Sequence, residues 1–172
     1  ALCKLQVTYG SVIQLQHVPT KRFLSATNFK YFHPSSSGQH QVIAVDQQDG
    51  YTHWRVMPRS GQRWELVKDV PVKNGEVIRL LNLRTSRNLH SHDGPISPLS
   101  KQREVSNFGE EYGSIDSNDN WVVKTQDEFW YMTKPVELKH APTKSPLISS
   151  DDFDNKNYTF GFQEVACKIQ SM

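Results

Sequence analysis

The sequence contains little cysteine and no long hydrophobic run. Its two cysteines among 172 residues are Cys3 and Cys167, near opposite ends of the chain. They are too few for the disulfide framework of a small secreted domain. One bridge between them would close a very long loop and stabilise the fold by about 4–5 kcal/mol, and the alternative is two buried thiols. No apolar run approaches the roughly 20 residues that cross a bilayer, so we expect no direct membrane insertion.

The sequence also lacks an excess of charge of one sign. Its 20 basic and 18 acidic residues leave a net charge of +2. The nearest approach to a basic stripe is Arg79, Arg84 and Arg87, which are interrupted by leucine and asparagine. Proteins that bind nucleic acids carry a clustered basic surface, so we expect no nucleic-acid partner.

Motifs of the common catalytic sites are missing as well. The sequence has no glycine-rich phosphate loop, no nucleophile elbow and no HExxH zinc motif. Its acidic stretches are Glu110-Glu111, Asp116–Asp119 and Ser150–Asp154, and solvated loop charge is their ordinary interpretation. The residues therefore give no support for an enzyme and indicate no cofactor.

One histidine cluster suggests a metal site at first sight. His90, His92 and Asp93 lie within four residues. On an extended strand His90 and His92 point the same way, but the sequence offers no obvious third or fourth ligand for a zinc ion. We therefore predict no metal, and a structural or ligand-contacting strand at this place.

The main positive feature of the sequence is a motif that occurs three times. It has the frame aliphatic-x-Leu-x-His/Asn-x-x-Thr-x-x-x-Leu and occupies Ile13–Leu24, Ile78–Leu89 and Val136–Leu147. Each copy is followed by a second shared block that ends in Val42, Val105 or Val165. Copies one and two then close with an aromatic strand that begins at Trp54 or Trp121, and copy three does not reach a tryptophan. A repeat of this length predicts the architecture of the whole chain.

Alternation of apolar and polar residues predicts strands with very little helix. Each unit offers about four strands, and a single unit cannot bury its apolar face. We therefore predict an all-β fold, a β-trefoil with pseudo-threefold symmetry, in which closure removes exposed sheet edges. An ordinary β-sandwich does not explain three copies in phase. The expected repeats within the single domain 1–172 are about 9–58, about 72–125 and about 130–172. The third is incomplete, unless Cys167–Gln170 supply a short closing strand.

The repeated residues have expected roles in this fold. The leucines should fill the barrel, and Trp54 and Trp121 should plug it, each with an indole N–H that needs a partner. His17, Asn82 and His140 share one position, which fits a side chain that caps a turn together with the following threonine. The segment 58–73 is expected to be a hairpin or a link between units.

Two features concern the cellular route. Asn157-Tyr158-Thr159 is an acceptor pattern for N-glycosylation and favours the secretory pathway. The chain begins at Ala1 without methionine, which fits either a removed signal peptide or a shortened chain.

Copy two carries the segments that resemble a known family. They are Gly75–Leu80, Thr85–His92, Ser97–Ser100 and Glu104–Glu111. The run Arg-Asn-Leu-His-Ser-His within them is typical of MIR domains, and the Ser-Pro-Leu-Ser and Phe-Gly-Glu-Glu pieces are similar to stromal cell-derived factor two-like proteins. The chain therefore resembles the MIR domain family, in particular this group. It is also similar to the MIR domains of protein O-mannosyltransferases.

The resemblance implies a β-trefoil of three MIR repeats without catalytic activity. It implies residence in the endoplasmic reticulum lumen or secretory pathway, with a role in protein quality control and O-mannosylation. Its expected partners are a J-domain co-chaperone, the BiP chaperone and unfolded clients. The alternatives are a luminal MIR module of a protein O-mannosyltransferase, and a carbohydrate-binding module that contacts mannosyl glycans.

The resemblance also points to candidate site residues. Only copy two has His-Ser-His after its leucine, while copy one has Phe23–Ala26 and copy three has Leu147–Ser150 at that place. We therefore expect Arg87, His90, His92 and Asp93 to form a contact surface for a ligand or partner. The chain ends without a Lys-Asp-Glu-Leu retention signal, so residence would depend on a partner or on further residues.

Overall fold

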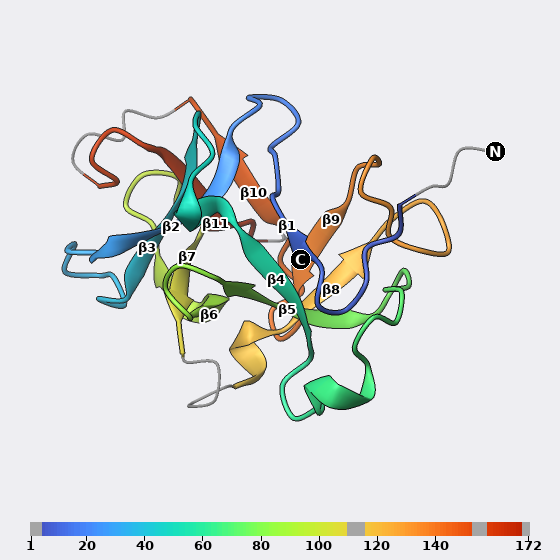
Figure 1. Cartoon of the computed structure of the whole chain (residues 1–172). Helices are drawn as coiled ribbons and strands as arrows, with labels where there is room; N and C mark the ends of the chain where they lie inside the picture. The colour runs from blue at the N-terminus through green and yellow to red at the C-terminus, as the bar shows by residue number, and fades with distance from the viewer. Residues whose placement is uncertain (1–4, 110–115, 153–157, 170–172) are drawn as a thin grey trace.

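The computed structural model describes residues 5–109, 116–152 and 158–169. The predicted all-β fold is confirmed, because these residues form one 11-stranded antiparallel sheet and three short 3₁₀ helices (Figure 1). The strands are β1 (Val12–Ile13), β2 (Phe23–Lys30), β3 (His40–Val45), β4 (Trp54–Pro58), β5 (Val77–Asn82), β6 (Asn88–Ile96), β7 (Arg103–Phe108), β8 (Trp121–Lys124), β9 (Glu137–His140), β10 (Leu147–Ser150) and β11 (Gln163–Cys167). The 3₁₀ helices are η1 (Gly50–Thr52), η2 (Trp64–Leu66) and η3 (Ser117–Asp119).

The strands pair in a pattern that repeats along the chain. The closing strand of repeat one, β4, pairs with β1 and with β5 of repeat two. The closing strand of repeat two, β8, pairs in the same way with β5 and with β9 of repeat three. Strands β3, β7 and β11 pair with one another. This cyclic pairing is consistent with the predicted β-trefoil.

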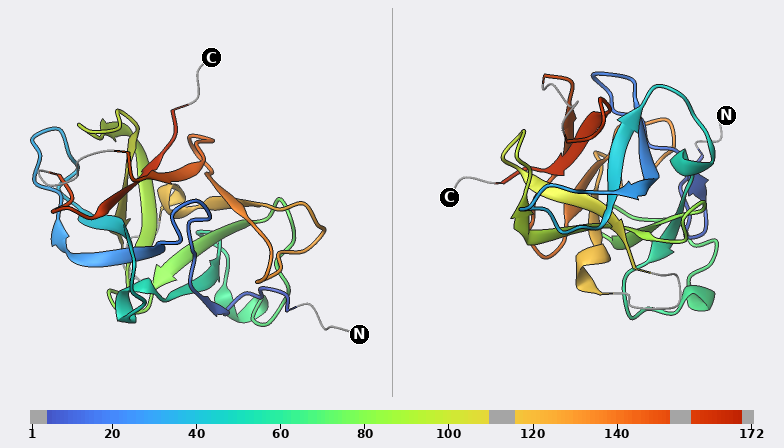
Figure 2. Two further views of the ribbon diagram at one scale, coloured as in Figure 1. Left: turned by 90° about the horizontal axis from the view of Figure 1, so that it is seen from above. Right: turned by 90° about the vertical axis from the view of Figure 1, so that its left-hand side faces the viewer.

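The two kinds of pairing occupy different ends of the molecule. The hairpins β2–β3, β6–β7 and β10–β11 gather on one side, and β1, β4, β5, β8 and β9 lie on the other (Figures 1 and 2). Repeat three has only β9, β10 and β11 in the described part of the chain. Cys167 belongs to β11, while Lys168 and Ile169 lie outside any strand. Residues 167–169 therefore do not form a separate closing strand. For this part of the chain, the alternative of a short closing strand at Cys167–Gln170 is wrong.

The shared histidine or asparagine caps a turn in all three copies, as predicted. The residue four positions further on donates its backbone N–H to the carbonyl of the capping residue. It has a positive φ, with values of 62° at Lys21, 58° at Ser86 and 59° at Lys144. The capping side chain bonds the threonine of the frame in each copy: His17–Thr20 at 2.7 Å, Asn82–Thr85 at 3.5 Å and His140–Thr143 at 2.8 Å.

The two repeated tryptophans lie at the centre of the core. Trp54 and Trp121 are both fully buried. Their indole N–H groups donate to equivalent carbonyls, that of Leu24 at 3.0 Å and that of Leu89 at 2.9 Å. The partner that each indole N–H needs is therefore the backbone carbonyl of the leucine that ends the repeated frame. Apart from Pro58, which ends β4, the segment 58–73 contains η2 and no strand, so it is a link between units.

Candidate functional site

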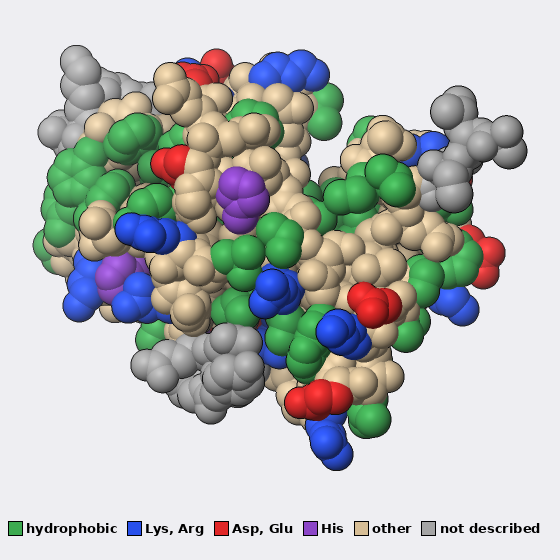
Figure 3. Space-filling view, viewed as in Figure 1, with side chains coloured by type: hydrophobic (Ala, Val, Ile, Leu, Met, Phe, Trp, Pro, Cys, Tyr) green, Lys and Arg blue, Asp and Glu red, His purple; other side chains and the backbone are tan. Residues whose placement is uncertain are grey.

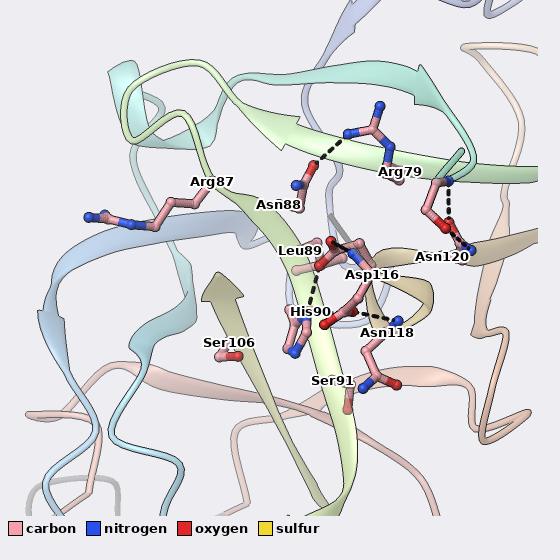
Figure 4. Close-up of polar contacts among 12 residues, drawn as sticks. Arg79, Arg87, Asn88, Leu89, His90, Ser91, Ser106, Asp116, Asn118 and Asn120 are labelled. Atoms are coloured by element: carbon pink, nitrogen blue, oxygen red, sulfur yellow. Dashed lines mark hydrogen bonds and ion pairs between the residues drawn. The ribbon is translucent and has the colours of Figure 1, made fainter. Parts of the chain in front are cut away.

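A buried pair of side chains joins strand β6 to helix η3. His90 in β6 is 1% exposed, and Asp119 in η3 is fully buried. Nδ1 of His90 lies 2.6 Å from a carboxylate oxygen of Asp119, and its Nε2 lies 2.9 Å from Nε2 of His92. Figure 4 shows His90 beside the η3 segment that carries Asp116 and Asn118. A continuous row of polar side chains thus runs from η3 to the partly exposed His92.

The carboxylates of η3 hold this short helix in place. The side chain of Asp116 accepts the N–H of Asn118 at 2.8 Å, and that of Asp119 accepts the N–H of Asp116 at 3.1 Å. These bonds form a capping box. The interpretation of residues 116–119 as solvated charge is wrong for Asp119, because the capping box turns this carboxylate toward His90. The same interpretation agrees with the exposed side chains of residues 151 and 152, while the acidic residues at 110, 111 and 154 lie outside the described part of the chain.

Repeat one builds the same turn without the histidine–aspartate pair. Its helix η1 has a capping box between Asp49 and Thr52. Thr52 takes the place of Asp119 and donates a hydrogen bond to the side chain of Gln14 at 2.7 Å. Ser25 takes the place of His90 in the repeated frame. The histidine and the aspartate therefore occur together in repeat two and are replaced together in repeat one.

The hydrogen bonds fix one proton of the row. The carboxylate of Asp119 accepts, so His90 donates through Nδ1. Nε2 of His92 lies 2.9 Å from Nε2 of His90 and 3.4 Å from the side-chain amide nitrogen of Gln39. Nδ1 of His92 is buried without a hydrogen-bond partner among the described residues. Burial, together with the neighbouring His90, lowers the pKa of His92 to about 4, so His92 is neutral at physiological pH.

This arrangement does not activate a nucleophile. An activated nucleophile is a hydroxyl or thiol within hydrogen-bond reach of the base. In the described part of the chain, Nε2 of His90 faces another imidazole instead. Burial also raises the pKa of Asp119, while the hydrogen bond from His90 opposes that shift. The row of polar side chains therefore holds η3 against β6.

Three residues around this pair are of types that ligate metal ions. Ligand atoms of His90, Asp116 and Asp119 lie within 4.8 Å of one another. Two ligands of one tetrahedral zinc ion are about 3.3 Å apart, given bonds of roughly 2.0–2.1 Å. The 2.6 Å contact between His90 and Asp119 is shorter and is that of a hydrogen bond. We therefore assign no metal to this cluster.

Two of the predicted site residues lie apart from the histidines. Arg87 is partly exposed and points away from His90 (Figure 4). Asp93 is 86% exposed at its side chain and pairs with Arg103 at 2.9 Å, an exposed ion pair that contributes little stability. The structure thus brings together His90 and His92, adds Asp119 to them, and does not join them to Arg87 or Asp93.

A surface patch of phenylalanines is a feature that the sequence interpretation missed. The ring of Phe160 lies 5.1 Å from that of Phe29 and 5.3 Å from that of Phe32. Phe32, Phe160 and Phe162 are 55%, 53% and 43% exposed. We call these four residues the aromatic patch. Figure 3 shows hydrophobic side chains gathered over the β2–β3 hairpin and the turn before β11, with basic and histidine side chains beside them.

The turn that presents the aromatic patch has an unusual backbone. Phe160 has a φ of 53° and Gly161 a φ of 88°. A bulky residue with positive φ is strained and is rare in proteins. Phe160 nevertheless takes this conformation and holds its ring at the surface. Such strain is typical of functional positions.

Two further predicted sites include residues outside the described part. Cys167 is a free, fully buried thiol, and burial raises its pKa to about 12. Cys3, its expected disulfide partner, lies outside the described residues, so the bridge stays a prediction. Asn157 also lies outside them, while Tyr158 and Thr159 of the same glycosylation pattern are buried.

Comparison with known proteins defines the family. The family model described as "MIR domain" matches residues 31–171. The chain belongs to the MIR domain family. The sequence is 40% identical over 164 residues to a stromal cell-derived factor 2-like protein of Dictyostelium discoideum, covering 94% of this chain and 76% of that one. The chain spans only 60–66% of the length of its mammalian relatives, which are named stromal cell-derived factor 2 or stromal cell-derived factor 2-like protein 1.

Solved structures agree with this assignment. The crystal structure of the SDF2-like protein from Arabidopsis thaliana has a TM-score of 0.85 and 32% identity, covering 98% of this MIR domain and 91% of that chain. A dolichyl-phosphate-mannose–protein mannosyltransferase of Candida albicans is 32% identical over 96% of this chain but only 20% of its own length. Among the described residues of this MIR domain, no helix is long and apolar enough to cross a membrane.

Proposed function

We propose that this MIR domain is a non-catalytic adaptor of the endoplasmic reticulum lumen that binds chaperones or client polypeptides in protein quality control. Its family membership supports the adaptor role, and the expected partners are those that the resemblance implies. The observation that carries polypeptide binding is the aromatic patch. Exposed apolar clusters mark protein-interaction surfaces, and aromatic side chains are enriched in the centres of interfaces.

The structure of the patch suits binding to unfolded segments. Its rings come from β2, from the loop that follows β2 and from the turn before β11, and the ring contacts join these segments. Lys30 lies next to Phe29 in the chain and is exposed. The patch thus offers apolar contact to a partner side chain, with positive charge close by. Such contacts do not require one specific sequence in the bound segment.

A titration with a permanently unfolded polypeptide tests this function. A reduced and carboxymethylated protein, labelled with a fluorophore, is the probe, and anisotropy reports binding. Replacing Phe32 by serine and Phe160 by asparagine should weaken binding at least about tenfold, because aromatic residues dominate interface energies. Asparagine is chosen at 160 because it tolerates the positive φ.

A matched control removes a different exposed apolar side chain. Leu66 in η2 is 71% exposed and lies outside the patch, so Leu66→Ser should leave the affinity unchanged. Equal binding by the wild type and the Phe32→Ser/Phe160→Asn variant would show that the aromatic patch does not bind the polypeptide. Absence of binding by the wild type would remove client binding altogether.

A second candidate is the luminal MIR module of a protein O-mannosyltransferase. The likeness to the Candida albicans enzyme over 96% of this chain favours it. The full-length gene product distinguishes the two functions. Hydrophobic spans on either side of this segment would decide for the enzyme module, and a signal peptide without such spans would decide for the adaptor.

A further inference from the structure

Three polar side chains hold equivalent places in the three repeats. Gln41 in β3, Glu104 in β7 and Glu164 in β11 each come directly before the shared valine of the second block. These strands pair with one another (Figure 1), and in each pairing one of the three residues lies diagonally across from the next, so all three share one face of the sheet. Diagonal neighbours of this kind are about 7–8 Å apart. The two carboxyl groups therefore lie in one small region.

Both carboxyl groups are buried. Glu104 is 2% exposed and Glu164 is 4% exposed. The ion pairs of the described residues include neither of them, and Oε2 of Glu164 is buried without a hydrogen-bond partner among these residues. Burial raises the pKa of both carboxyl groups, and hydrogen bonds from serine side chains oppose that shift. A negative charge at this place is costly because it is removed from water without a paired cation.

Few titratable groups face the two carboxyl groups. From the segments packed against them, these groups are Tyr31 after β2, Tyr158 before β11 and His90 in β6. The tyrosines stay neutral near neutral pH, because burial raises their pKa. Arg103 is the basic neighbour in β7, and its guanidinium bonds Asp93 at 2.9 Å. Ionisation of the glutamates therefore adds negative charge that these neighbours do not neutralise.

The loop that carries Phe32 is held by Glu104. Ser37 lies in this loop, between β2 and β3. Its backbone N–H donates to one carboxyl oxygen of Glu104 at 3.2 Å, and its hydroxyl bonds the other oxygen. Tyr31, directly before Phe32, is 3% exposed, and its hydroxyl donates to the carbonyl of Val105 at 2.8 Å. Contacts at Glu104 and directly beside it thus fix the loop to β7.

The turn that carries Phe160 lies over the same region. The side-chain N–H of Gln41 donates to the carbonyl of Tyr158 at 3.2 Å. The ring of Tyr158 stacks on that of Tyr31, with the centroids 5.2 Å apart. Burial, together with the two nearby carboxyl groups, raises the pKa of the Tyr158 hydroxyl. Both segments that present the aromatic patch therefore cover the buried glutamates, and water reaches the carboxyl groups where these segments move away.

We propose that Glu104 and Glu164 form a proton-controlled switch beneath the aromatic patch. When both carboxyl groups are neutral, the loop with Phe32 and the turn with Phe160 are held against the barrel. When they ionise, hydration of the charge favours states in which these two segments open locally, and the patch loses its fixed arrangement. The inference rests on the proposed function, because it describes how pH controls the binding of a polypeptide to the patch.

The direction of the pH dependence follows from linkage. A carboxyl group whose pKa is raised in the folded state binds its proton more tightly there than in the unfolded chain, where its pKa has the ordinary value of 4.5. The stability gained in this way is fully present below that value and is lost as the pH rises through the pKa of the folded state. Burial lowers the pKa of His92 and His140 to about 4, and these residues act in the opposite direction. The glutamates are therefore isolated by comparing variants with the wild type.

A variant without the two acids tests the switch. Glu104→Gln/Glu164→Gln keeps the size and polarity of both side chains and removes their ionisation. Thermal unfolding of this variant and of the wild type is followed by circular dichroism between about pH 5 and about pH 8. The melting temperature of the variant relative to the wild type should rise with pH by at least about 3 °C, the effect of roughly one unit of pKa in a domain of this size. Glu65→Gln/Glu128→Gln changes two exposed glutamates and should give a difference that does not depend on pH.

The wild-type chain supplies a second measurement, so the test remains valid if the double variant fails to fold. In a nuclear magnetic resonance titration, the side-chain carboxyl carbons of Glu104 and Glu164 should titrate at higher pH than those of Glu65 and Glu128. Hydrogen exchange, corrected for its intrinsic pH dependence, reports local opening. Protection of residues 31–39 and 158–162 should fall as the pH rises.

Binding of the carboxymethylated polypeptide measures the consequence for the patch. The wild type should bind this probe several-fold more tightly at about pH 5.5 than at about pH 7.5, because neutral carboxyl groups keep the patch in place. Glu104→Gln/Glu164→Gln should bind it equally at both values. Glu65→Gln/Glu128→Gln should keep the pH dependence of the wild type.

The outcomes separate the switch from the proposed function. A melting-temperature difference that does not change with pH, or carboxyl groups of Glu104 and Glu164 that titrate together with the exposed ones, would overturn the switch. The same pH dependence of binding in the wild type and the Glu104→Gln/Glu164→Gln variant would overturn its link to the patch. If the wild type does not bind the probe at any pH, the proposed function and this link fail together, while the thermal and resonance measurements still decide on the switch.

Discussion

Replacing Trp121 by alanine is expected to lower the free energy of unfolding by about 3–5 kcal/mol, the range for large aromatic residues lost from a core. Trp121 is fully buried, and its indole bonds the carbonyl of Leu89 at 2.9 Å. The substitution removes the ring, leaves a cavity and leaves that carbonyl without its partner. Urea unfolding followed by circular dichroism measures the change.

Two comparisons show whether the repeat explains the effect. Trp54→Ala should cost a similar amount, because Trp54 makes the equivalent bond to Leu24 at 3.0 Å. Trp121→Phe should cost less, since a ring remains in the core and only the N–H is lost. If Trp54→Ala and Trp121→Ala differ by more than about 2 kcal/mol, outside the ordinary spread of core substitutions, the structural equivalence of repeats one and two is contradicted.

Replacing Asp119 by alanine is expected to destabilise the fold by about 3 kcal/mol, because a buried hydrogen-bond donor loses its acceptor and a short helix loses its cap. His90 is 1% exposed, so its Nδ1–H would remain buried without an acceptor. The capping box of η3 would be lost as well. Denaturant unfolding at neutral pH gives the change in free energy.

Asp116 supplies the matched control for this variant. It belongs to the same capping box, but its side chain is 50% exposed. Asp116→Ala should cost about 1 kcal/mol, the value of a lost cap. A nuclear magnetic resonance spectrum of the histidine side chains should show a larger change at His90 in Asp119→Ala than in Asp116→Ala. Equal costs for the two variants would contradict the role of the His90 pair.

Local features of the repeat could be predicted from the sequence. The shared position of His17, Asn82 and His140 indicated a capped turn, because histidine and asparagine have in common a side chain that hydrogen-bonds backbone. The burial of Trp54 and Trp121 followed from their place in the strands that close copies one and two. These predictions succeeded because the contacts involved recur in the chain at fixed spacing.

Contacts between distant segments could not be predicted in this way. The bond between His90 and Asp119 depends on how η3 folds back on β6. The only local feature of the sequence that points to this bond is the pattern Asp-x-x-Asp before Trp121. The same pattern is also typical of solvated charge in a loop. The aromatic patch joins Phe29 to Phe160 across most of the chain, and no periodicity links the two. The predicted surface therefore included Arg87 and Asp93 and missed Asp119 and the phenylalanines.

The repeats are equivalent as scaffolds and unequal as surfaces. Repeat two alone carries the His90–Asp119 pair, and the patch combines residues of repeats one and three. The positions that the three copies share indicate what holds the fold together.

Affinity capture from an endoplasmic reticulum luminal extract tests the adaptor function most directly. The immobilised wild-type chain is compared with the Phe32→Ser/Phe160→Asn variant, whose circular dichroism spectrum first shows that it is folded, and bound proteins are identified by mass spectrometry. The account predicts recovery of a J-domain co-chaperone and the BiP chaperone by the wild type, and fewer client polypeptides on the variant. Recovery of neither chaperone by a folded wild-type chain would contradict it.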